Sequence, residues 1–371
     1  MELTFDAEQL ELGRVLRSFL ERRSDEAAVR RLMVTDGGFD EAVWRQLAGE
    51  LGVLGLAVPE QYGGSGYGLR ELGVVFEETG RALLCAPLFA TAALAVPTLL
   101  ASGDASACER YLPGIVAGDT VATVALTEQS GRWDERSVSL PASSADGGWT
   151  LTGTKTNVLD GQLAALVLVA ARTPGGVSLF AVDGSAPGLT RTALDTMDQT
   201  RKQARLDFDG VPAQLVGAQG EGWPAVQRAL QQAATLLACE QVGGAQRVLD
   251  MSVEYATLRL QFGRPIGSFQ AIKHRCADML VAVESARSVA YHGVWTADAD
   301  PDELPVAASM AKVYASEAFV RCARDNIQIH GGVGFTWEHP AQLYLKRAVS
   351  SELLLGSPAY HRQLLADQIG V

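Results

Sequence analysis

The segment from Arg259 to Ile266, with the sequence RLQFGRPI, carries the most distinctive set of chemically useful side chains in the chain. It combines a guanidinium, an amide and an aromatic ring, and Gly263 and Pro265 end any helix that precedes it. Gln270 follows shortly afterwards, in SFQAIKH. Such a set can grip a nucleotide, with the guanidinium on a phosphate and the ring against adenine. The same residues also suit a purely structural helix-turn-helix, and the segment alone leaves both interpretations open.

Other motifs of nucleotide or metal chemistry are weak. The Gly-rich stretch from Pro59 to Gly68 contains GGSGYG, which has neither the GxGxxG spacing nor the terminal GK[ST] of a phosphate loop, so we expect an ordinary loop. The five cysteines are odd in number and far apart, which predicts buried reduced thiols rather than disulfides or a zinc site. We therefore expect no metal site.

Bulk composition limits the class of protein. The 371 residues are 47% hydrophobic and 20% charged, as in ordinary globular proteins, and this length predicts two or three packed units. The net charge of −12 argues against nucleic acid as a partner. The N-terminal sequence lacks the pattern of a signal peptide, and no apolar run is long enough to cross a bilayer. We expect a cytoplasmic location and no membrane partner.

Three segments with different hydrophobic periods must position the chemically useful residues. Residues 1–119 repeat apolar positions every three or four residues and are predicted to be helical. Residues 120–217 contain short apolar runs separated by Gly and Pro turns, which predicts a compact antiparallel β domain with a hairpin around TPGG. Residues 218–371 return to the helical period. The fold class is therefore α+β, in the order helical domain, β domain, helical bundle.

Two helices of the last segment have informative patterns. Residues 224–257 form one predicted helix, whose Ala- and Gly-rich stretch from Ala233 to Ala245 allows another helix or a flat ligand to approach closely. In the next helix, apolar residues step by three and four and indicate one buried stripe. The stripe consists of Phe269, Ile272, Cys276, Met279, Val283, Ala286 and Ala290.

Several motifs, in order along the chain, resemble the acyl-CoA dehydrogenase family. They are ALTE at 125–128, WTLTGTK at 149–155, LDTMDQTR leading to LDFDGVP across 194–212, RLQFGRPIGSFQ followed by ADM, and QIHGGVGFTWEHP at 328–340. The resemblance spans the whole chain and implies that family's fold, with an N-terminal helical domain, a central antiparallel β domain and a C-terminal four-helix bundle. It also implies an FAD-dependent oxidoreductase that desaturates an acyl-CoA between Cα and Cβ. Family members are generally tetramers, and electron-transferring flavoprotein usually reoxidises their flavin.

The resemblance assigns cofactor roles to individual positions. In the family, FAD lies at a subunit interface and the neighbouring chain supplies contacts to its ADP half. The matching residues here are Arg259, Gln261, Phe262, Gln270, Gln328, Gly331 and Gly332. On the side of the flavin ring, only Thr127 is clearly kept.

The glutamate that removes the α proton in this family has no counterpart in the chain. The common position of that base is occupied by Leu355, and the position used by a second group within the family is occupied by Ala233. Glu240 and Glu352 lie nearby in sequence and are alternative bases. A helix–helix contact for Glu240 and an ion pair with an Arg for Glu352 are the competing interpretations. Loss of a placed base costs about 10²- to 10⁴-fold in rate.

Further departures gather on the flavin-ring side. The family's Gly-Ser pair for the pyrophosphate, its Trp-Ile-Thr against the ring, and its Thr and Gln after the base are all replaced. The replacements are Arg132 and Trp133, then Asn157, Val158 and Leu159, and finally Ser357 and Ala359.

This one-sided loss resembles the subunits of actinobacterial heteromeric (α2β2) acyl-CoA dehydrogenases that lack the usual Glu. Our hypothesis is a non-catalytic subunit in lipid or steroid catabolism, which lends ADP-side contacts to the FAD of a Glu-bearing homologous partner. Three alternatives remain. One is a self-sufficient dehydrogenase that has a displaced base and assembles from identical chains. The others are a flavin oxygenase or oxidase of secondary metabolism, and a scaffold without flavin.

Overall fold

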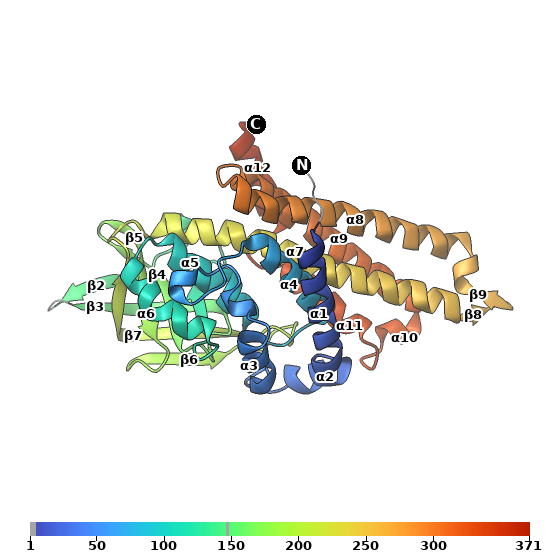
Figure 1. Cartoon of the computed structure of the whole chain (residues 1–371), viewed down its shortest axis with the longest axis horizontal. Helices are drawn as coiled ribbons and strands as arrows, with labels where there is room; N and C mark the ends of the chain where they lie inside the picture. Colours follow the sequence, from blue (N-terminus) through green and yellow to red (C-terminus); the bar gives the residue numbers. More distant parts are fainter. Residues whose placement is uncertain (1–4, 146–147) are drawn as a thin grey trace. The chain divides into compact units, whose positions relative to one another are not determined.

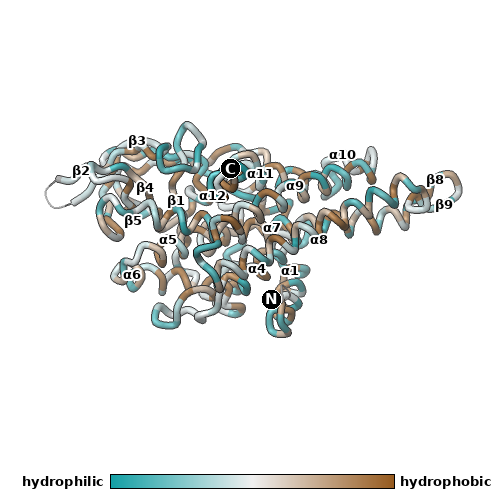
Figure 2. The backbone as a smooth tube through the Cα atoms, turned by 90° about the horizontal axis from the view of Figure 1, so that it is seen from above, coloured by the Kyte–Doolittle hydropathy of each residue, from teal (hydrophilic) through white to brown (hydrophobic). Residues whose placement is uncertain are grey.

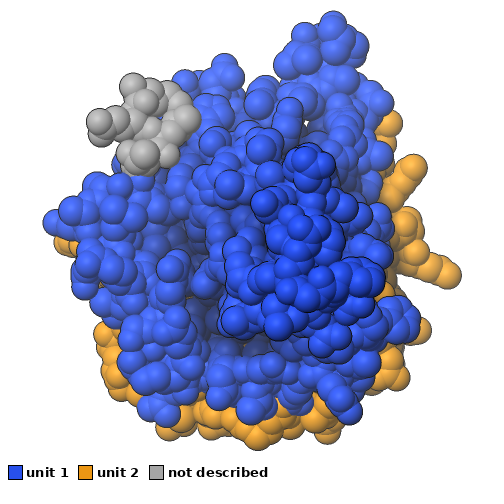
Figure 3. Space-filling view, turned by 90° about the vertical axis from the view of Figure 1, so that its right-hand side faces the viewer, with its two compact units in different colours: residues 1–30, 69–84, 234–371 blue, residues 31–68, 85–233 orange. Residues whose placement is uncertain are grey.

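The computed structural model describes residues 5–145 and 148–371, which form two compact units (Figures 1 and 3). Unit 1 takes its described residues from Met1–Arg30, Leu69–Leu84 and Ala234–Val371. Unit 2 comprises Arg31–Gly68 and Cys85–Ala233. Each unit therefore combines segments that are distant in sequence.

Unit 1 is built almost entirely from helices. They are α1 (Ala7–Arg23), most of α2 (Glu26–Met33), α4 (Leu69–Arg81), most of α7 (Gly222–Leu258), α8 (Gln270–Ala299), α9 (Leu304–His330), α10 (Gly332–Phe335), α11 (Ala341–Leu353) and α12 (Pro358–Ile369). A small hairpin, β8 (Leu260–Gln261) and β9 (Arg264–Pro265), follows α7, and the 3-10 turn η5 (Ile266–Ser268) leads into α8.

Local sequence explains where several of these helices begin and end. The side chain of Asp6 accepts hydrogen bonds from the amides of Glu8 and Gln9, and Gln9 Oε1 accepts from the amide of Asp6, which is a complete capping box for α1. Ser357 caps α12 in the same manner by accepting from the amide of Tyr360.

Glycines on α4 and α7 allow these two helices to touch through their backbones. A Cβ on Gly243 would lie 1.8 Å from the carbonyl oxygen of Glu77, and a Cβ on Gly80 would lie 2.0 Å from that of Glu240. On the other side of α7, Gly244 faces the ring of Phe319 from α9. The small-residue stretch of α7 thus serves close helix packing, one of the two roles expected for it.

Unit 2 surrounds a seven-stranded sheet in the order β1-β4-β5-β7-β3-β2, with β6 paired to β7. The strands are β1 (Ala122–Ala125), β2 (Ala142–Ala145), β3 (Gly148–Leu159), β4 (Leu166–Thr173), β5 (Gly176–Asp183), β6 (Leu189–Ala193) and β7 (Gln203–Val216). Its helical elements are α3 (Glu41–Gly49), the 3-10 turns η1 (Val53–Gly55), η2 (Glu60–Tyr62) and η4 (Glu135–Ser137), the π-helix η3 (Phe89–Ala95), α5 (Val96–Ala101) and α6 (Ala105–Val116).

The sheet departs from the predicted antiparallel pattern at one pair of strands. β1 and β4 are parallel, with Ala122 opposite Leu166, whereas the other paired strands are antiparallel. The long segment between β1 and β4, which contains β2 and β3, provides the crossover that a parallel pair requires. The hairpin around TPGG is confirmed as β4–β5, with Thr173 opposite Gly176.

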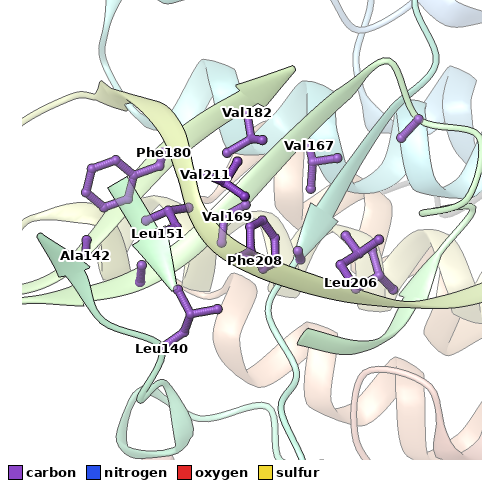
Figure 4. Close-up of a cluster of buried hydrophobic side chains, with 14 of the residues drawn as sticks. Leu140, Ala142, Leu151, Val167, Val169, Phe180, Val182, Leu206, Phe208 and Val211 are labelled. Carbon is purple, nitrogen blue, oxygen red and sulfur yellow. The ribbon is translucent and has the colours of Figure 1, made fainter. Parts of the chain in front are cut away.

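Inward-facing residues of the strands form the core of unit 2 (Figure 4). Leu151, Val167, Phe180 and Leu206 come from different strands and are fully buried. Trp149 packs on Phe180 with ring centroids 5.3 Å apart. β6 was not predicted because four of its five residues are exposed, so its sequence lacks the alternation of a half-buried strand.

The stripe predicted along α8 is buried only in its second half. Met279, Val283, Ala286 and Ala290 are buried, whereas the residues at the start of the stripe are only half-buried. That end of α8 runs with α7 to the β8–β9 hairpin, which projects from the other helices of unit 1 (Figure 2). The exposed first half therefore offers apolar surface that the other helices of unit 1 leave partly uncovered.

All five cysteines are free thiols, as predicted, and four of them are buried. Across residues 5–145 and 148–371, no helix has both the length and the apolar character needed to cross a membrane.

Candidate functional site

The β8–β9 hairpin presents the Arg259–Phe262 motif. Leu260 pairs with Pro265 and Gln261 with Arg264, which leaves Phe262 and Gly263 as a two-residue turn. Both turn residues have positive φ, 54° and 77°, as a type I′ turn requires. The amide of Ile266 donates to the carbonyl oxygen of Arg259 at 2.8 Å and closes the hairpin. The motif is thus a helix end followed by a tight hairpin.

A ring stack brings the other half of the predicted cofactor set to the same end of unit 1. Tyr255, one turn before Arg259 on α7, stacks on His330 at the end of α9 with centroids 4.3 Å apart. Gln328 precedes His330, and Gly331 and Gly332 follow it, so the two sequence motifs meet here. The seven predicted ADP-side residues are all exposed in this chain.

Exposed apolar side chains surround these predicted contacts. Phe262 is 85% exposed and Phe335 is 78% exposed. We call the following set the distal patch: Leu258, Leu260, Phe262, Val333, Phe335 and Trp337. All six lie in or next to the two sequence segments that carry the predicted contacts, and their exposure makes these segments a candidate interaction surface.

Leu355 stands in a turn that a buried network holds rigidly. Its φ is +61°, a left-handed value that costs free energy in a branched residue, and its side chain is 3% exposed. His361 Nε2 donates to the carbonyl oxygen of Leu355 at 3.0 Å. Burial, together with the charge of Lys312, lowers the pKa of His361 to about 4, so this imidazole is neutral at neutral pH.

Lys312 stabilises the same turn through hydrogen bonds to its backbone. Its ammonium group is fully buried and donates to the carbonyl oxygens of Ser351 and Glu352 at 3.1 and 3.0 Å, and to Ser316 Oγ at 2.9 Å. These carbonyls belong to the last turn of α11, where a cation is favoured. The position at which the sequence predicts the family's base is therefore filled by a buried alkyl side chain, which cannot accept a proton.

Glu240 forms a buried ion pair instead of facing a ligand. Its Oε1 lies 2.9 Å from Arg347 Nη1, and the two side chains are 6% and 4% exposed. The pair joins α7 to α11. Of the two interpretations of Glu240, an alternative base or a helix–helix contact, it therefore supports the second. Ala233, which the sequence predicts to occupy the second base position, is fully buried on α7 and offers only a methyl group.

Glu352 lines a charged cleft between α8 and α9. The other residues that line this cleft include three cations, Arg275, Arg321 and Arg324, and the anion Asp278. Arg275 pairs with Asp325 at 2.5 Å and Arg321 with Asp278 at 3.3 Å. The setting of Glu352 is that of a surface charge network.

Thr127 is buried against strand β3. Its hydroxyl donates to the carbonyl oxygen of Thr156 at 2.5 Å, and the amide of Thr156 donates back to the carbonyl oxygen of Thr127 at 2.9 Å. The next residue, Glu128, pairs with the fully buried Lys155 at 2.8 Å and accepts hydrogen bonds from the amide and hydroxyl of Ser139.

The Glu128–Lys155 pair has strongly shifted pKa values. Burial alone would raise the pKa of Glu128, but Lys155, Ser139 and the Leu140 amide together lower it to about 2. Burial lowers the pKa of Lys155 to about 8 although the neighbouring carboxylate opposes that shift. The pair anchors both ends of the loop that carries Arg132 and Trp133.

Val158 and Leu159, which the sequence predicts to occupy flavin-ring positions, offer no polar side chain to a ligand. Both side chains are buried, and Val158 belongs to the core cluster of unit 2. Asn157 is exposed and has φ of +53°, next to a register shift between β3 and β7. Ser357 is engaged as the cap of α12.

Sequence reasoning missed several groups that shape this site, above all Lys312, Arg347, His361 and Tyr255. A usable signal existed for Lys312, because a lysine in the Ala-rich stretch of α9 falls on a buried face and needs acceptors. The other three are recognisable only once the helices are packed.

Three family models cover nearly the whole chain. The acyl-CoA dehydrogenase N-terminal domain matches residues 6–119, the middle domain matches 123–211 and the C-terminal domain matches 220–370.

Individual relatives agree over their full lengths. The chain is 37% identical to the acyl-CoA dehydrogenase IpdE2 of Mycobacterium tuberculosis over 96% of this chain and 95% of that protein. A solved structure of a variant of the Tcur3481-Tcur3483 steroid ACAD matches with a TM-score of 0.87 and 33% identity, covering 98% of both chains. The ChsE4-ChsE5 complex from Mycobacterium tuberculosis matches with a TM-score of 0.91 and 30% identity, covering 100% of this chain and 99% of that chain.

Proposed function

Because the chain belongs to the acyl-CoA dehydrogenase family, we propose that it is the non-catalytic subunit of a heteromeric acyl-CoA dehydrogenase. In this role it lends ADP-side contacts to an FAD whose ring lies in a homologous partner. The partner carries the Glu that removes the α proton of a CoA thioester.

The single observation that carries this proposal is the state of both base positions. Leu355 and Ala233 are buried alkyl groups, and Glu240 is held by Arg347 in a buried ion pair. A general base must lie within hydrogen-bond reach of the proton it removes and must be free to accept it. Glu240 is bound in an ion pair and Glu352 lines a charged surface cleft, so neither carboxylate suits the task.

The flavin-ring side supports the same conclusion from unit 2. Where the family has Ile and Thr against the ring, Val158 and Leu159 are buried, and neither carries a polar side chain. FAD, when bound, supplies the acceptor for the hydride that leaves Cβ. This chain fits the ADP half of that cofactor and lacks polar groups at these ring positions.

The ADP-side residues fit a cofactor that another chain completes. Arg259 offers a guanidinium for phosphate, Phe262 a ring for adenine, and Gly331 and Gly332 a backbone with no atoms within 4 Å of where a Cβ would stand. The surrounding distal patch is apolar and exposed, as expected of a surface that a homologous subunit covers.

We propose a CoA thioester of a lipid or steroid as the substrate of the assembly and electron-transferring flavoprotein as its oxidant. The likeness to the Tcur3481-Tcur3483 steroid ACAD supports a steroid substrate. The names Tcur3481-Tcur3483 and ChsE4-ChsE5 each join two different chains, which supports an assembly of two kinds of subunit.

The test is to purify the chain alone and together with a Glu-bearing homologue encoded beside it, and to assay enoyl-CoA formation from steroid side-chain thioesters. We expect activity only in the mixed assembly, and its loss when the partner's Glu is replaced by Gln. Full activity of the lone chain would contradict the proposal. Hydrogen peroxide or a hydroxylated product without enoyl-CoA would instead indicate a flavin oxidase or oxygenase.

A further inference from the structure

The loop from Gly331 to Glu338, here called the ADP loop, has to be held in place by side chains outside its glycines. Gly331 has φ of 63° and ψ of −137°, a conformation that only glycine adopts readily, and it turns the chain sharply at the end of α9. Much of the loop is exposed, including Gly332, Phe335 and Trp337. A loop that must present backbone amides to a phosphate needs a rigid base.

Three rings in contact form that base. His330, which precedes the loop, stacks on Tyr255 from α7, and its ring is tilted by 48° against that of His339, which follows the loop. The centroid distances are 4.3 Å to Tyr255 and 4.4 Å to His339. Because His330 and His339 flank the loop on either side, their contact closes it at its root.

Hydrogen bonds orient both imidazoles, and the bond at His339 requires a neutral ring. Nδ1 of His330 lies 2.8 Å from the carbonyl oxygen of Asn326, so this nitrogen carries the proton and donates. Nδ1 of His339 accepts from the amide of Ala341 at 3.2 Å, so the proton of this ring is on Nε2. Protonation of His339 at Nδ1 would remove the acceptor for Ala341, the first residue of α11.

A second set of contacts holds the C-terminal part of the loop. The ring of Trp337 lies 5.9 Å from the guanidinium of Arg30 and 4.2 Å from Nζ of Lys346. Arg30 also donates to the carbonyl oxygen of Glu338 at 3.1 Å. These cation–π contacts do not depend on histidine protonation, so they hold the C-terminal part of the loop independently of the histidine pair.

We propose that Tyr255, His330 and His339 are positioning residues that clamp the ADP loop for the cofactor, and that acid opens this clamp. This inference rests on the proposed ADP-side function and adds its regulation by pH.

The charges around the clamp set the direction of its response. α7 contributes the ring of Tyr255, α2 contributes Glu26 and Arg30, and α11 contributes Lys346. Burial lowers the pKa of His330, and burial followed by the charge of His330 lowers the pKa of His339. Glu26 opposes the shift of His339 and Arg30 adds to it.

The direction in which the stability of the clamp changes with pH follows from these depressed pKa values. A histidine whose folded pKa is depressed stabilises the folded clamp above its ordinary pKa of about 6.5, and this contribution is lost as the pH falls through the folded value. Protonating both rings would also place two positive charges in contact. The clamp is thus closed at neutral and alkaline pH and opens in acid.

The test measures the rate of FAD release from the intact assembly with its partner, by the rise in flavin fluorescence, at about pH 8 and about pH 5.5. Variants of this chain are His339→Ala, the double variant His330→Phe and His339→Phe, and Arg259→Ala as the reference for ADP-side binding. His292→Gln removes a half-buried histidine of α8 outside the clamp and is the matched control.

We expect wild-type release to be several-fold faster at the acid pH, because protonation of the two histidines weakens the clamp. His339→Ala should accelerate release at both pH values. The double Phe variant, which keeps three rings that cannot be protonated, should lose the acid acceleration, while His292→Gln should behave as wild type.

Two results would overturn the clamp. One is a double Phe variant with the wild-type pH profile, a measurement that decides the matter even if His339→Ala fails to fold. The other is wild-type release from His339→Ala at both pH values while Arg259→Ala releases faster. If Arg259→Ala itself released FAD at the wild-type rate, the ADP-side function would be wrong and the clamp would fall with it.

Discussion

The carboxylate of Glu240 and the guanidinium of Arg347 meet at 2.9 Å in the interior of unit 1, with less than a tenth of either side chain exposed. The pair satisfies two charges that could not otherwise be buried between α7 and α11. Glu240 is also the first carboxylate that follows Ala233 in the sequence, and the ion pair engages it. Glu240, which the sequence offered as an alternative base, is therefore engaged in a buried ion pair.

Replacing one member of this pair should destabilise the chain without changing catalysis. Arg347→Met removes the guanidinium that faces the buried carboxylate of Glu240, which costs about 3 to 5 kcal/mol of unfolding free energy. Urea unfolding monitored by circular dichroism measures this loss. Combining Glu240→Leu with Arg347→Met should recover most of it. A Glu240→Gln assembly that folds normally but loses dehydrogenase activity would mean that Glu240 is a base after all.

Removing the amine of Lys312 should loosen the turn around Leu355. Lys312→Met leaves the carbonyls of Ser351 and Glu352 without their buried donor, and we expect a loss of about 2 to 4 kcal/mol. Thermal unfolding provides the measurement. Lys273→Met, on the exposed face of α8, is the control and should change stability by no more than about 0.5 kcal/mol. Equal effects of the two variants would refute the supporting role of Lys312.

Introducing a carboxylate at the family's base position should not create an enzyme. Leu355→Glu in the lone chain places a charge in a buried turn and does not alter Val158 or Leu159 on the ring side. We expect lower thermal stability and no enoyl-CoA formation from thioester substrates. Turnover by this variant alone would show that the chain retains a functional flavin-ring pocket.

Unit 2 should lose stability in acid because of Glu128. Its pKa is about 2 in the folded chain, below the ordinary value near 4.5. A depressed carboxylate pKa stabilises the fold above the ordinary value, and that stability is lost as the pH falls from about 4.5 towards about 2. Urea unfolding of wild type and Glu128→Gln should therefore converge over this range. Parallel pH profiles for the two proteins would contradict the assignment.

The sequence predicted those parts of the fold that repeat with a simple period. Long α7 and α8 and the β4–β5 hairpin follow from hydrophobic spacing and turn residues. It did not predict the parallel pairing of β1 with β4, because strand partners distant in sequence leave no local pattern. β6 escaped for a different reason, since an exposed strand buries too few side chains to alternate.

The candidate site divides in a similar way. Arg259 and Gly331 could be singled out because their motifs are contiguous in sequence. The partners that decide the fate of Glu240 and Leu355 could not, since Arg347 and Lys312 approach them only through helix packing. Three-dimensional contact was needed to tell a buried ion pair from a displaced base.

The flavin content of the purified mixed assembly tests division of labour between the two subunits most directly. Visible absorbance of the bound flavin, set against the protein concentration, gives the ratio of flavins to chains. We predict half as many flavins as chains, because the proposed function places the flavin ring only in the partner, and a further drop when Arg259 is replaced by Ala. One flavin for every chain, retained in the Arg259→Ala assembly, would contradict the role proposed for this subunit.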